Sequence, residues 1–306
     1  MIGRVRGGGA EFAATALYLL YGCLVVALPA LTIPLALFCP SLWCILASGT
    51  STRRAFLAGA APLALAVLPW AGQGAAVYAL FYVAAMLMHS SMNRSMTALA
   101  VIAPTVLAAS VIASAMLVSA HAEGASLGDV VSRWVQEVMK GSRDAADAML
   151  YGAELEEFKA MLETARSRIV TLFPGLVLTG CAFVFWVNLV IANAKTHRVG
   201  LRTYRVPDAL IACFIAAGTL SVLPWEKLSA VGLNLLLVVG FVYFLQGLAI
   251  ASVFMDSRGW PAFIRSAIYI LIFIQIYMVI VVAAVGLFDA WFDFRARITT
   301  RKGEYT

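Results

Sequence analysis

Long apolar runs separated by short polar stretches set the pattern of this chain. No charged side chain occurs from Phe12 to Thr52, and none occurs from Leu228 to Met255. A helix rises about 1.5 Å per residue, so about 20 apolar residues cross a hydrocarbon layer of about 30 Å. Runs of this length predict helices that span a membrane.

Nine apolar segments follow one another along the chain. They cover approximately residues 12–30, 33–49, 55–70, 74–92, 96–120, 169–193, 209–223, 228–254 and 266–287. Pro29, Pro34 and Pro40 interrupt the first two segments, because proline lacks a backbone donor and disfavours helix in the residue before it. These two are either short crossings or one crossing with a re-entrant piece. The predicted fold class is all-α, a polytopic transmembrane helix bundle with eight or nine crossings, some short or broken by proline.

The stretch from His121 to Arg168 is different, because it is rich in charge and amphipathic. One apolar stripe at helical spacing consists of Leu127, Val130, Val131, Trp134, Val135 and Val138, and a second of Tyr151, Leu155, Phe158 and Leu162. Gly141-Ser142 is the expected break between two helices, with Ser142 as the N-cap. The predicted domains are transmembrane helices over 1–120, an extramembrane helical insertion over 121–168, further transmembrane helices over 169–288, and an interfacial helix with a basic tail over 289–306.

The polar side chains inside the predicted crossings are uncharged. The candidates for a ligand-facing or helix-packing role are Asn188, Asn234, Tyr243, Gln246 and Gln275. Burying an amide without a hydrogen bond costs several kcal/mol, so we expect Gln246 to point into protein. Gly240 and Gly247 share a face of small residues beside it, which favours close helix packing in lipid.

The last crossing ends in the string GLFDAWFDFRAR, residues 286–297. Aromatic side chains beside arginines are typical of a membrane–water boundary. We therefore expect an exposed interfacial motif made of Asp289, Trp291, Asp293 and Arg295, and no acidic side chain in the middle of the membrane.

Composition supports a membrane protein and excludes several other classes. Hydrophobic residues make up 62% of the 306 residues and charged residues 12%, whereas soluble domains carry about 25% charged residues. The net charge of +6 then reflects basic loops on the cytoplasmic side rather than nucleic-acid binding. The basic residues Arg4, Arg6, Arg53, Arg54 and Arg94 and the loop over 195–205 can all be cytoplasmic with nine crossings. Arg94 and the 195–205 loop flank the acidic insertion, and both favour placing it outside. This assignment leaves the basic C-terminal tail unexplained.

The sequence carries no motif for catalysis or metal binding. It has no Walker A string, no HExxH and no GxSxG, and its five cysteines lie in apolar runs without metal-ligand spacing. We therefore expect no catalytic residues, no metal, no cofactor and no enzymatic activity.

Four strings carry a family resemblance. FPGLVLTGCAFVFWVNLVIA (173–192), YRVPDALI (204–211), GLNLLLVVGFVYFLQGLAI (232–250) and GLFDAWFDFR (286–295) resemble the YybS-like family of bacterial multi-pass membrane proteins. The resemblance implies a place in the bacterial cytoplasmic (inner) membrane and a domain without an assigned molecular function. More remotely, the family is similar to the substrate-binding subunits of energy-coupling-factor transporters and to the rod-shape protein MreD.

Two functions follow as expectations. The first is a small-molecule binding or transport subunit that depends on a separate energising protein, because the chain has no P-loop. The alternative is a non-transporting scaffold or assembly factor for envelope machinery. Besides the lipid bilayer, the expected partners are thus an energising or an envelope protein, and the oligomeric state stays open. A polar cavity open to one side would support the first function.

Overall fold

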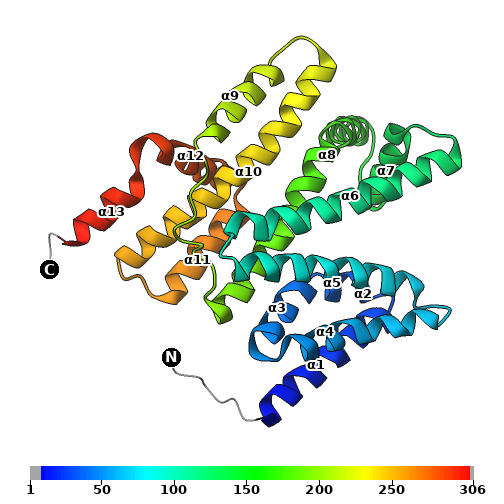
Figure 1. Cartoon of the computed structure of the whole chain (residues 1–306). Helices are drawn as coiled ribbons and strands as arrows, with labels where there is room; N and C mark the ends of the chain where they lie inside the picture. The colour runs from blue at the N-terminus through cyan, green and yellow to red at the C-terminus, as the bar shows by residue number, and fades with distance from the viewer. Residues whose placement is uncertain (1–7, 304–306) are drawn as a thin grey trace. The chain divides into compact units, whose positions relative to one another are not determined.

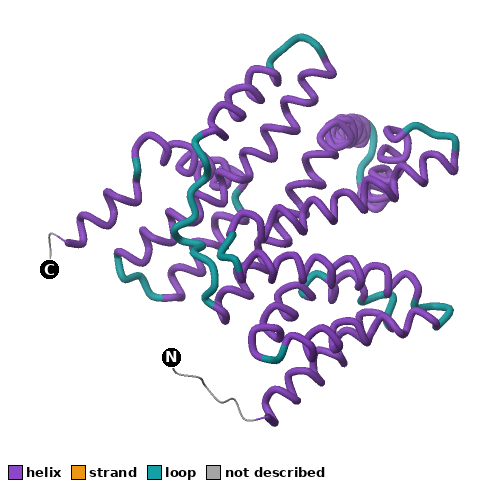
Figure 2. The backbone as a smooth tube through the Cα atoms, viewed as in Figure 1, coloured by secondary structure: helices purple, strands orange, loops and turns teal. Residues whose placement is uncertain are grey.

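The computed structural model describes residues 8–303, and every regular element in that range is a helix (Figure 1, Figure 2). The all-α prediction is confirmed. Arg4 and Arg6 lie outside the described residues. The chain forms two compact units, one comprising the residues up to Ser110 with Gly180–Leu201, the other comprising Val111–Thr179 and the residues from Arg202 on.

The first unit is built around α5. Its elements are α1 (Gly8–Ala27), α2 (Thr32–Ala36), α3 (Cys39–Gly49), α4 (Thr52–Ala60), the 3-10 helix η1 (Ala61–Val67), α5 (Gly72–Asn93), the beginning of α6 (Thr97–Glu123) and the end of α8 (Ala153–Thr196). Tyr78 and Met88 of α5 are fully buried, and the Tyr78 hydroxyl donates to the Gly59 carbonyl oxygen at 2.9 Å. The phenol thereby joins α5 to the end of α4.

The second unit is built around α10 (Glu226–Ser257), with α9 and α12 packed against it (Figure 1). Its other elements are α7 (Leu127–Met149), the first half of α8, α9 (Ala209–Ser221), α11 (Ala262–Ile274), α12 (Ile276–Phe292) and α13 (Phe294–Gly303). A Cβ atom on Gly247 would lie 2.0 Å from the Val282 carbonyl oxygen, and one on Gly286 would lie 1.9 Å from that of Tyr243. Only glycine permits so close an approach of α10 and α12.

Among residues 8–303, five helices are long and apolar enough to cross a membrane: α1, α5, α6, α8 and α10. The α11–α12 pair passes the same test but is bent by 105° at Gln275, so it is a broken span or a re-entrant loop rather than the single crossing predicted over 266–287. Helices α3 and α9 are apolar but shorter. The count of eight or nine crossings therefore stays a prediction.

The break predicted inside the amphipathic insertion is wrong in position. Gly141 and Ser142 lie within α7, and the chain turns instead at Leu150–Gly152, where Gly152 has φ +61°. The positive φ at Gly152 suits glycine and lets the chain turn into α8 at little cost. A glycine inside a helix, such as Gly141, costs only about 1 kcal/mol. The second predicted helix continues without interruption into the crossing as α8, which is 44 residues long. The division of the chain at residue 168 into extramembrane and transmembrane parts stays a prediction.

Ser142, predicted as the N-cap of the second helix, lies inside α7, and the N-cap of α7 is Ser126. The Ser126 hydroxyl oxygen accepts from the Asp129 backbone N–H at 3.2 Å, and the Ser126 backbone N–H donates to Asp129 Oδ2 at 3.0 Å. The two bonds together form a capping box. The Ser126 hydroxyl also donates to Asp129 Oδ2 at 2.6 Å, and this bond, together with the one from the Ser126 backbone N–H, holds the pKa of the Asp129 carboxyl below its usual range. The cap fixes where α7 begins.

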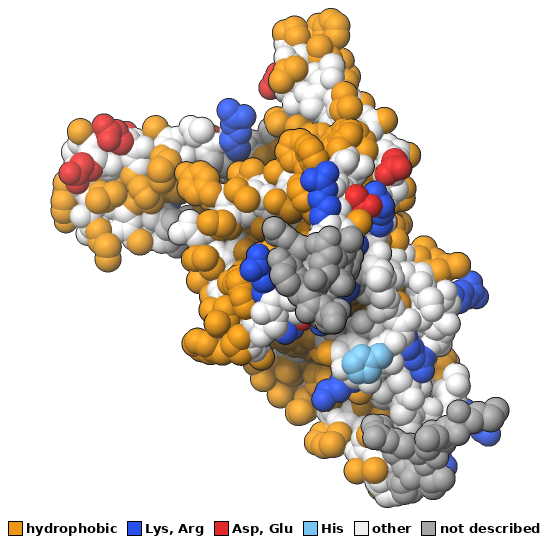
Figure 3. Space-filling view, turned by 90° about the vertical axis from the view of Figure 1, so that its left-hand side faces the viewer, with side chains coloured by type: hydrophobic (Ala, Val, Ile, Leu, Met, Phe, Trp, Pro, Cys, Tyr) orange, Lys and Arg blue, Asp and Glu red, His pale blue; other side chains and the backbone are white. Residues whose placement is uncertain are grey.

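Apolar side chains cover much of the surface. Figure 3 shows hydrophobic side chains over much of the face in view, with charged side chains standing singly or in small groups. Ile215 of α9, Val222 beyond its end and Ile280 of α12 are among the large apolar residues that are exposed. Contiguous exposed apolar surface on this scale fits a lipid environment.

Replacing Gly247 by alanine tests the close α10–α12 contact. We expect Gly247→Ala to destabilise the protein by about 2 kcal/mol, because the new methyl group forces two backbones apart and overpacking costs about 1–3 kcal/mol. Thermal unfolding of the detergent-purified protein is the measurement.

Gly240→Ala is the matched control on the same helix, since nothing lies within 4 Å of a Cβ atom there. Equal effects of the two substitutions would contradict the glycine contact.

Candidate functional site

Asn188, from the second half of α8, bridges the break between α2 and α3. Its Oδ1 accepts from the Ser41 N–H at 2.9 Å, and its Nδ2 donates to the Leu37 carbonyl oxygen at 2.8 Å. These two backbone groups are four residues apart, the spacing that an unbroken helix pairs directly. Pro40 lies between them, and the buried Asn188 side chain, 2% exposed, bonds to both groups in place of the direct helical hydrogen bond.

Asn234 of α10 makes the same kind of bridge on α8. Its Oδ1 accepts from the Gly175 N–H at 2.7 Å, and its Nδ2 donates to the Thr171 carbonyl oxygen at 2.9 Å. Pro174 directly precedes Gly175, and these backbone groups are again four residues apart. A Cβ atom on Gly175 would lie 2.9 Å from Asn234 Oδ1, so glycine leaves room for the amide. The inserted carboxamide ties α10 to α8 at the proline.

Gln246 of α10 holds a loop rather than a helix. Its Oε1 accepts from the N–H of Val206, the residue before Pro207, at 2.8 Å. Its Nε2 donates to Asp289 Oδ2 at 3.1 Å. Gln246 is 1% exposed, which confirms that it points into protein.

Asp289 is not at an exposed boundary, as the sequence suggested, but is buried with 1% exposure. Besides Gln246, its carboxylate accepts from the Phe294 N–H at 2.9 Å and lies 3.7 Å from the Arg295 Nε atom. The chain breaks at Asp293, which has φ +41°, so Phe294 begins α13 in a new direction that brings Arg295 back toward Asp289. Burial lowers the pKa of the Arg295 guanidinium, and the Asp289 charge opposes this shift.

The rest of the predicted set does not join these contacts. Gln275 is exposed at the bend between α11 and α12, and Trp291 is exposed on α12. Tyr243 is buried, its ring packs edge-on against Phe214 at 6.0 Å, and its hydroxyl has no hydrogen-bond partner within the described part of the chain. Asp293 is exposed and lies 3.9 Å from Arg205.

A second ionic group ties the 197–208 loop to the end of α10. Asp256 Oδ2 lies 2.7 Å from Arg202 Nη1, and Asp256 Oδ1 accepts from Arg265. The Arg295 guanidinium also donates to the Arg202 carbonyl oxygen at 3.2 Å. The sequence analysis treated Arg202 only as part of a topology-marking basic loop and placed Arg295 in the interfacial motif, and it did not pair either of them with a partner in the chain.

Polar side chains make up most of the lining of a cleft between α8 and α10. The cleft has a volume of about 530 Å³ and lies within the second unit. It is lined by Glu163, Thr164, Ser167, Arg168, Thr171, Leu172, Glu226, Ser229, Ala230 and Leu233. Ligand sites typically have volumes of about 300–1,000 Å³, so a small molecule fits. The sequence did not single out these residues, because they come from a charged helix face and a turn that looked merely solvated.

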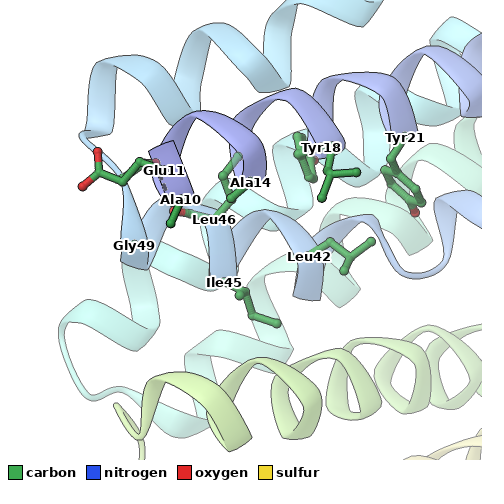
Figure 4. Close-up of a pocket in the computed structure, with 11 residues that line it drawn as sticks. Ala10, Glu11, Ala14, Tyr18, Tyr21, Leu42, Ile45, Leu46 and Gly49 are labelled. Carbon is green, nitrogen blue, oxygen red and sulfur yellow. Dashed lines mark hydrogen bonds between the residues drawn. The ribbon is translucent and has the colours of Figure 1, made fainter. Parts of the chain in front are cut away.

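An apolar cavity of about 300 Å³ lies in the first unit between α1 and α3. Figure 4 shows Tyr18 and Tyr21 on α1 and Leu42 and Ile45 on α3 along it, with Glu11 at one end. The Tyr18 hydroxyl is within 3.2 Å of Cys39 Sγ, and the Tyr21 hydroxyl donates to the Leu35 carbonyl oxygen. With these polar groups engaged elsewhere, the cavity suits apolar contents.

No group of three or more potential metal ligands occurs among residues 8–303. The long apolar helices, the buried amides and the exposed apolar surface define a polytopic helical membrane protein. It belongs to the family described as "Predicted membrane protein (DUF2232)", whose model matches residues 16–290.

One curated relative is the "Uncharacterized protein YybS" of Bacillus subtilis (strain 168), which is 24% identical over 157 residues. The match covers 47% of this chain and 50% of that protein, so it spans about half the length of the relative. The YybS-like resemblance is thereby confirmed. No solved structure matches the chain, and the remoter similarity to energy-coupling-factor subunits and MreD stays an expectation.

Removing the Asn188 bridge tests its structural role. We expect Asn188→Leu to destabilise the protein by about 2–4 kcal/mol, because two buried backbone groups lose their partner and each costs about 1–3 kcal/mol. Gln275→Leu is the control, because it also replaces a carboxamide by leucine, but at an exposed position. Thermal unfolding in detergent compares them, and an unaffected Asn188→Leu protein would contradict the bridge.

Neutralising Asp289 tests the link between Gln246 and α13. In Asp289→Asn, one acceptor oxygen becomes an NH₂ donor that faces the donor of either Gln246 or Phe294. We expect trypsin to cleave at Arg202 and Arg205 on the order of tenfold faster, since a lost buried bond costs about 1–3 kcal/mol and 1.4 kcal/mol is a factor of ten.

Asp293→Asn is the matched control for this experiment, because Asp293 is exposed and its pair with Arg205 is long. Faster cleavage in that variant than in Asp289→Asn would show that the surface pair, not the buried carboxylate, holds the loop.

Proposed function

We propose that the protein is a small-molecule-binding subunit of a membrane transport system and that the cleft between α8 and α10 is its binding site. The observation that carries the proposal is the lining of this cleft, where seven of the ten residues are charged or bear a hydroxyl. The buried amides are not part of the proposed site, because backbone groups and Asp289 already occupy their hydrogen-bonding atoms.

The hydroxyls of the cleft favour a ligand that donates hydrogen bonds. Thr164 donates to the Ala160 carbonyl oxygen, Thr171 to that of Ser167, and Ser229 to that of Ser221, at 2.8–3.0 Å. Since these protons are engaged within the protein, the hydroxyl oxygens offer acceptor lone pairs to a ligand. An amine or ammonium group matches that arrangement.

The charges of the cleft favour a zwitterion. Glu163 is paired with Arg166, which leaves Glu226 as the acid and Arg168 as the base without an ion-pair partner among the described residues. Glu226 would attract an ammonium group, and the Arg168 guanidinium would bind a carboxylate or phosphate through paired hydrogen bonds. The proposed ligand class is therefore a small zwitterionic metabolite.

The sequence supports the wider proposal that the protein is one subunit of a transport system in a bacterial membrane. Because the chain has no P-loop, transport would need a separate energising protein in the same membrane. The YybS-like resemblance supports a bacterial cytoplasmic membrane, and the lack of a nucleophile–base constellation supports binding rather than catalysis. The remote similarity to energy-coupling-factor substrate-binding subunits, an expectation from the sequence alone, would agree with this role.

Mass spectrometry of the natively purified protein tests the proposal. The protein is extracted from its own membranes in mild detergent, and the small molecules and proteins that accompany it are identified. We expect a zwitterionic metabolite that Arg168→Gln loses by at least tenfold, because one charge-assisted pair contributes about 1.5–3 kcal/mol.

Arg94→Gln is the matched control, since Arg94 is exposed in the turn after α5 and belongs to the other unit. A protein that retains its metabolite in Arg168→Gln would exclude the cleft as the site. Stable co-purification of envelope proteins with no metabolite bound would overturn the transport proposal and favour the scaffold alternative.

A further inference from the structure

The apolar surface of α7 is wider than its packing within the chain requires. At about 100° per residue, Leu127, Trp134 and Val138 fall within an arc of about 40°, next to the arc that holds Val131 and Val135. Val131 and Val135 are buried, but Leu127, Trp134 and Val138 are 44%, 53% and 64% exposed. We call these three residues the outer stripe of α7.

The contacts of α7 with α8 show which part of α8 lies at the same level as α7. The Trp134 ring lies edge-on to the Phe173 ring with 5.9 Å between centroids, and Arg166 Nη1 donates to Ser132 Oγ at 2.5 Å. Phe173 belongs to the apolar run of α8 that begins at Ile169, while Arg166 lies just before that run. This part of α7 is therefore level with the place where α8 changes from charged to apolar.

The opposite face of α7 carries the charges. Asp129, Arg133, Glu137, Lys140 and Asp147 are all exposed, with the Asp147 carboxylate 3.1 Å from Lys159 Nζ. The whole helix carries four acids and three bases, which nearly cancel. Such a helix gains little from anionic lipids, so apolar burial is what would hold it on a membrane.

We infer that α7 is an interfacial helix that docks on the surface of the bilayer, with its outer stripe inserted at the level of the lipid headgroups and the first acyl carbons. The partner is the lipid itself, because the stripe continues the lipid-facing surface of α8 at the depth where that helix enters the membrane. Tryptophan prefers this boundary, where its ring is buried and its N–H meets polar groups. The insertion is thus not fully surrounded by water, and this conclusion does not depend on the ligand of the cleft.

Fluorescence quenching in liposomes tests this placement. A fluorescent amino acid is incorporated by codon suppression at Val138, on the outer stripe, or at Lys140, about 200° further round the helix. Doxyl-labelled lipids quench a probe in the bilayer, and iodide quenches a probe in water. The native cysteines stay in place, and the full chain is reconstituted in zwitterionic lipid.

We expect the lipid quencher to act at least threefold more strongly than iodide at position 138, and the reverse order at position 140. Raising the salt from 0.1 to 1 M should leave the ratio at position 138 unchanged, because apolar burial is not screened. Quenching at position 138 by iodide alone would overturn the inference by placing the stripe in water. Protection from both quenchers would also overturn it, because a protein partner or a second copy would then cover the stripe.

Discussion

The structure depends on pairing backbone polar groups where prolines open the helices. Hydrocarbon offers no hydrogen bonds, so each unpaired N–H or C=O group there costs several kcal/mol. Asn188 and Asn234 meet this cost with one carboxamide each, which accepts from one backbone group and donates to its partner four residues away. An amide suits this task because it carries both functions without a charge. Each bridge also fixes the contact between the two helices that it joins.

The same chemistry extends to a charged cluster at Gln246. The Gln246 side chain accepts from the Val206 N–H and donates to the Asp289 carboxylate. Asp289 in turn accepts from the N–H of Phe294, the first residue of α13, and lies beside the Arg295 guanidinium. A buried carboxylate is tolerated because a donor or cation meets each of its oxygen atoms. The loop before α9, the middle of α10 and the end of α12 are thereby tied together, so the cluster determines the position of the basic loop.

The polar groups that hold the helices together are not those that line the proposed binding cleft. The chain itself occupies the hydrogen-bonding atoms of the buried amides, whereas hydroxyl-bearing and charged side chains line the proposed cleft between α8 and α10. Asn234 lies next to this cleft, because the Thr171 carbonyl oxygen that it binds belongs to a lining residue. The bridge can therefore set the spacing of α8 and α10 and hence the width of the cleft, which connects the packing to the proposed function.

The sequence by itself determined the class of the protein, because runs of about 20 uncharged residues have few stable alternatives to membrane helices. It also predicted correctly that Gln246 faces protein and that Gly247 lies in a helix contact, but Gly240, predicted on the same packing face, has no neighbour within 4 Å of a Cβ atom. Only the tertiary structure decided that Asp289 is buried. Its burial depends on the break in the helix at Asp293 and on a hydrogen bond from Gln246, which is 43 residues away in the sequence. It likewise decided which amides are bridges and which, such as Gln275, stay exposed. Helical periodicity places a side chain on a face, but the hydrogen-bonding partner comes from a distant segment.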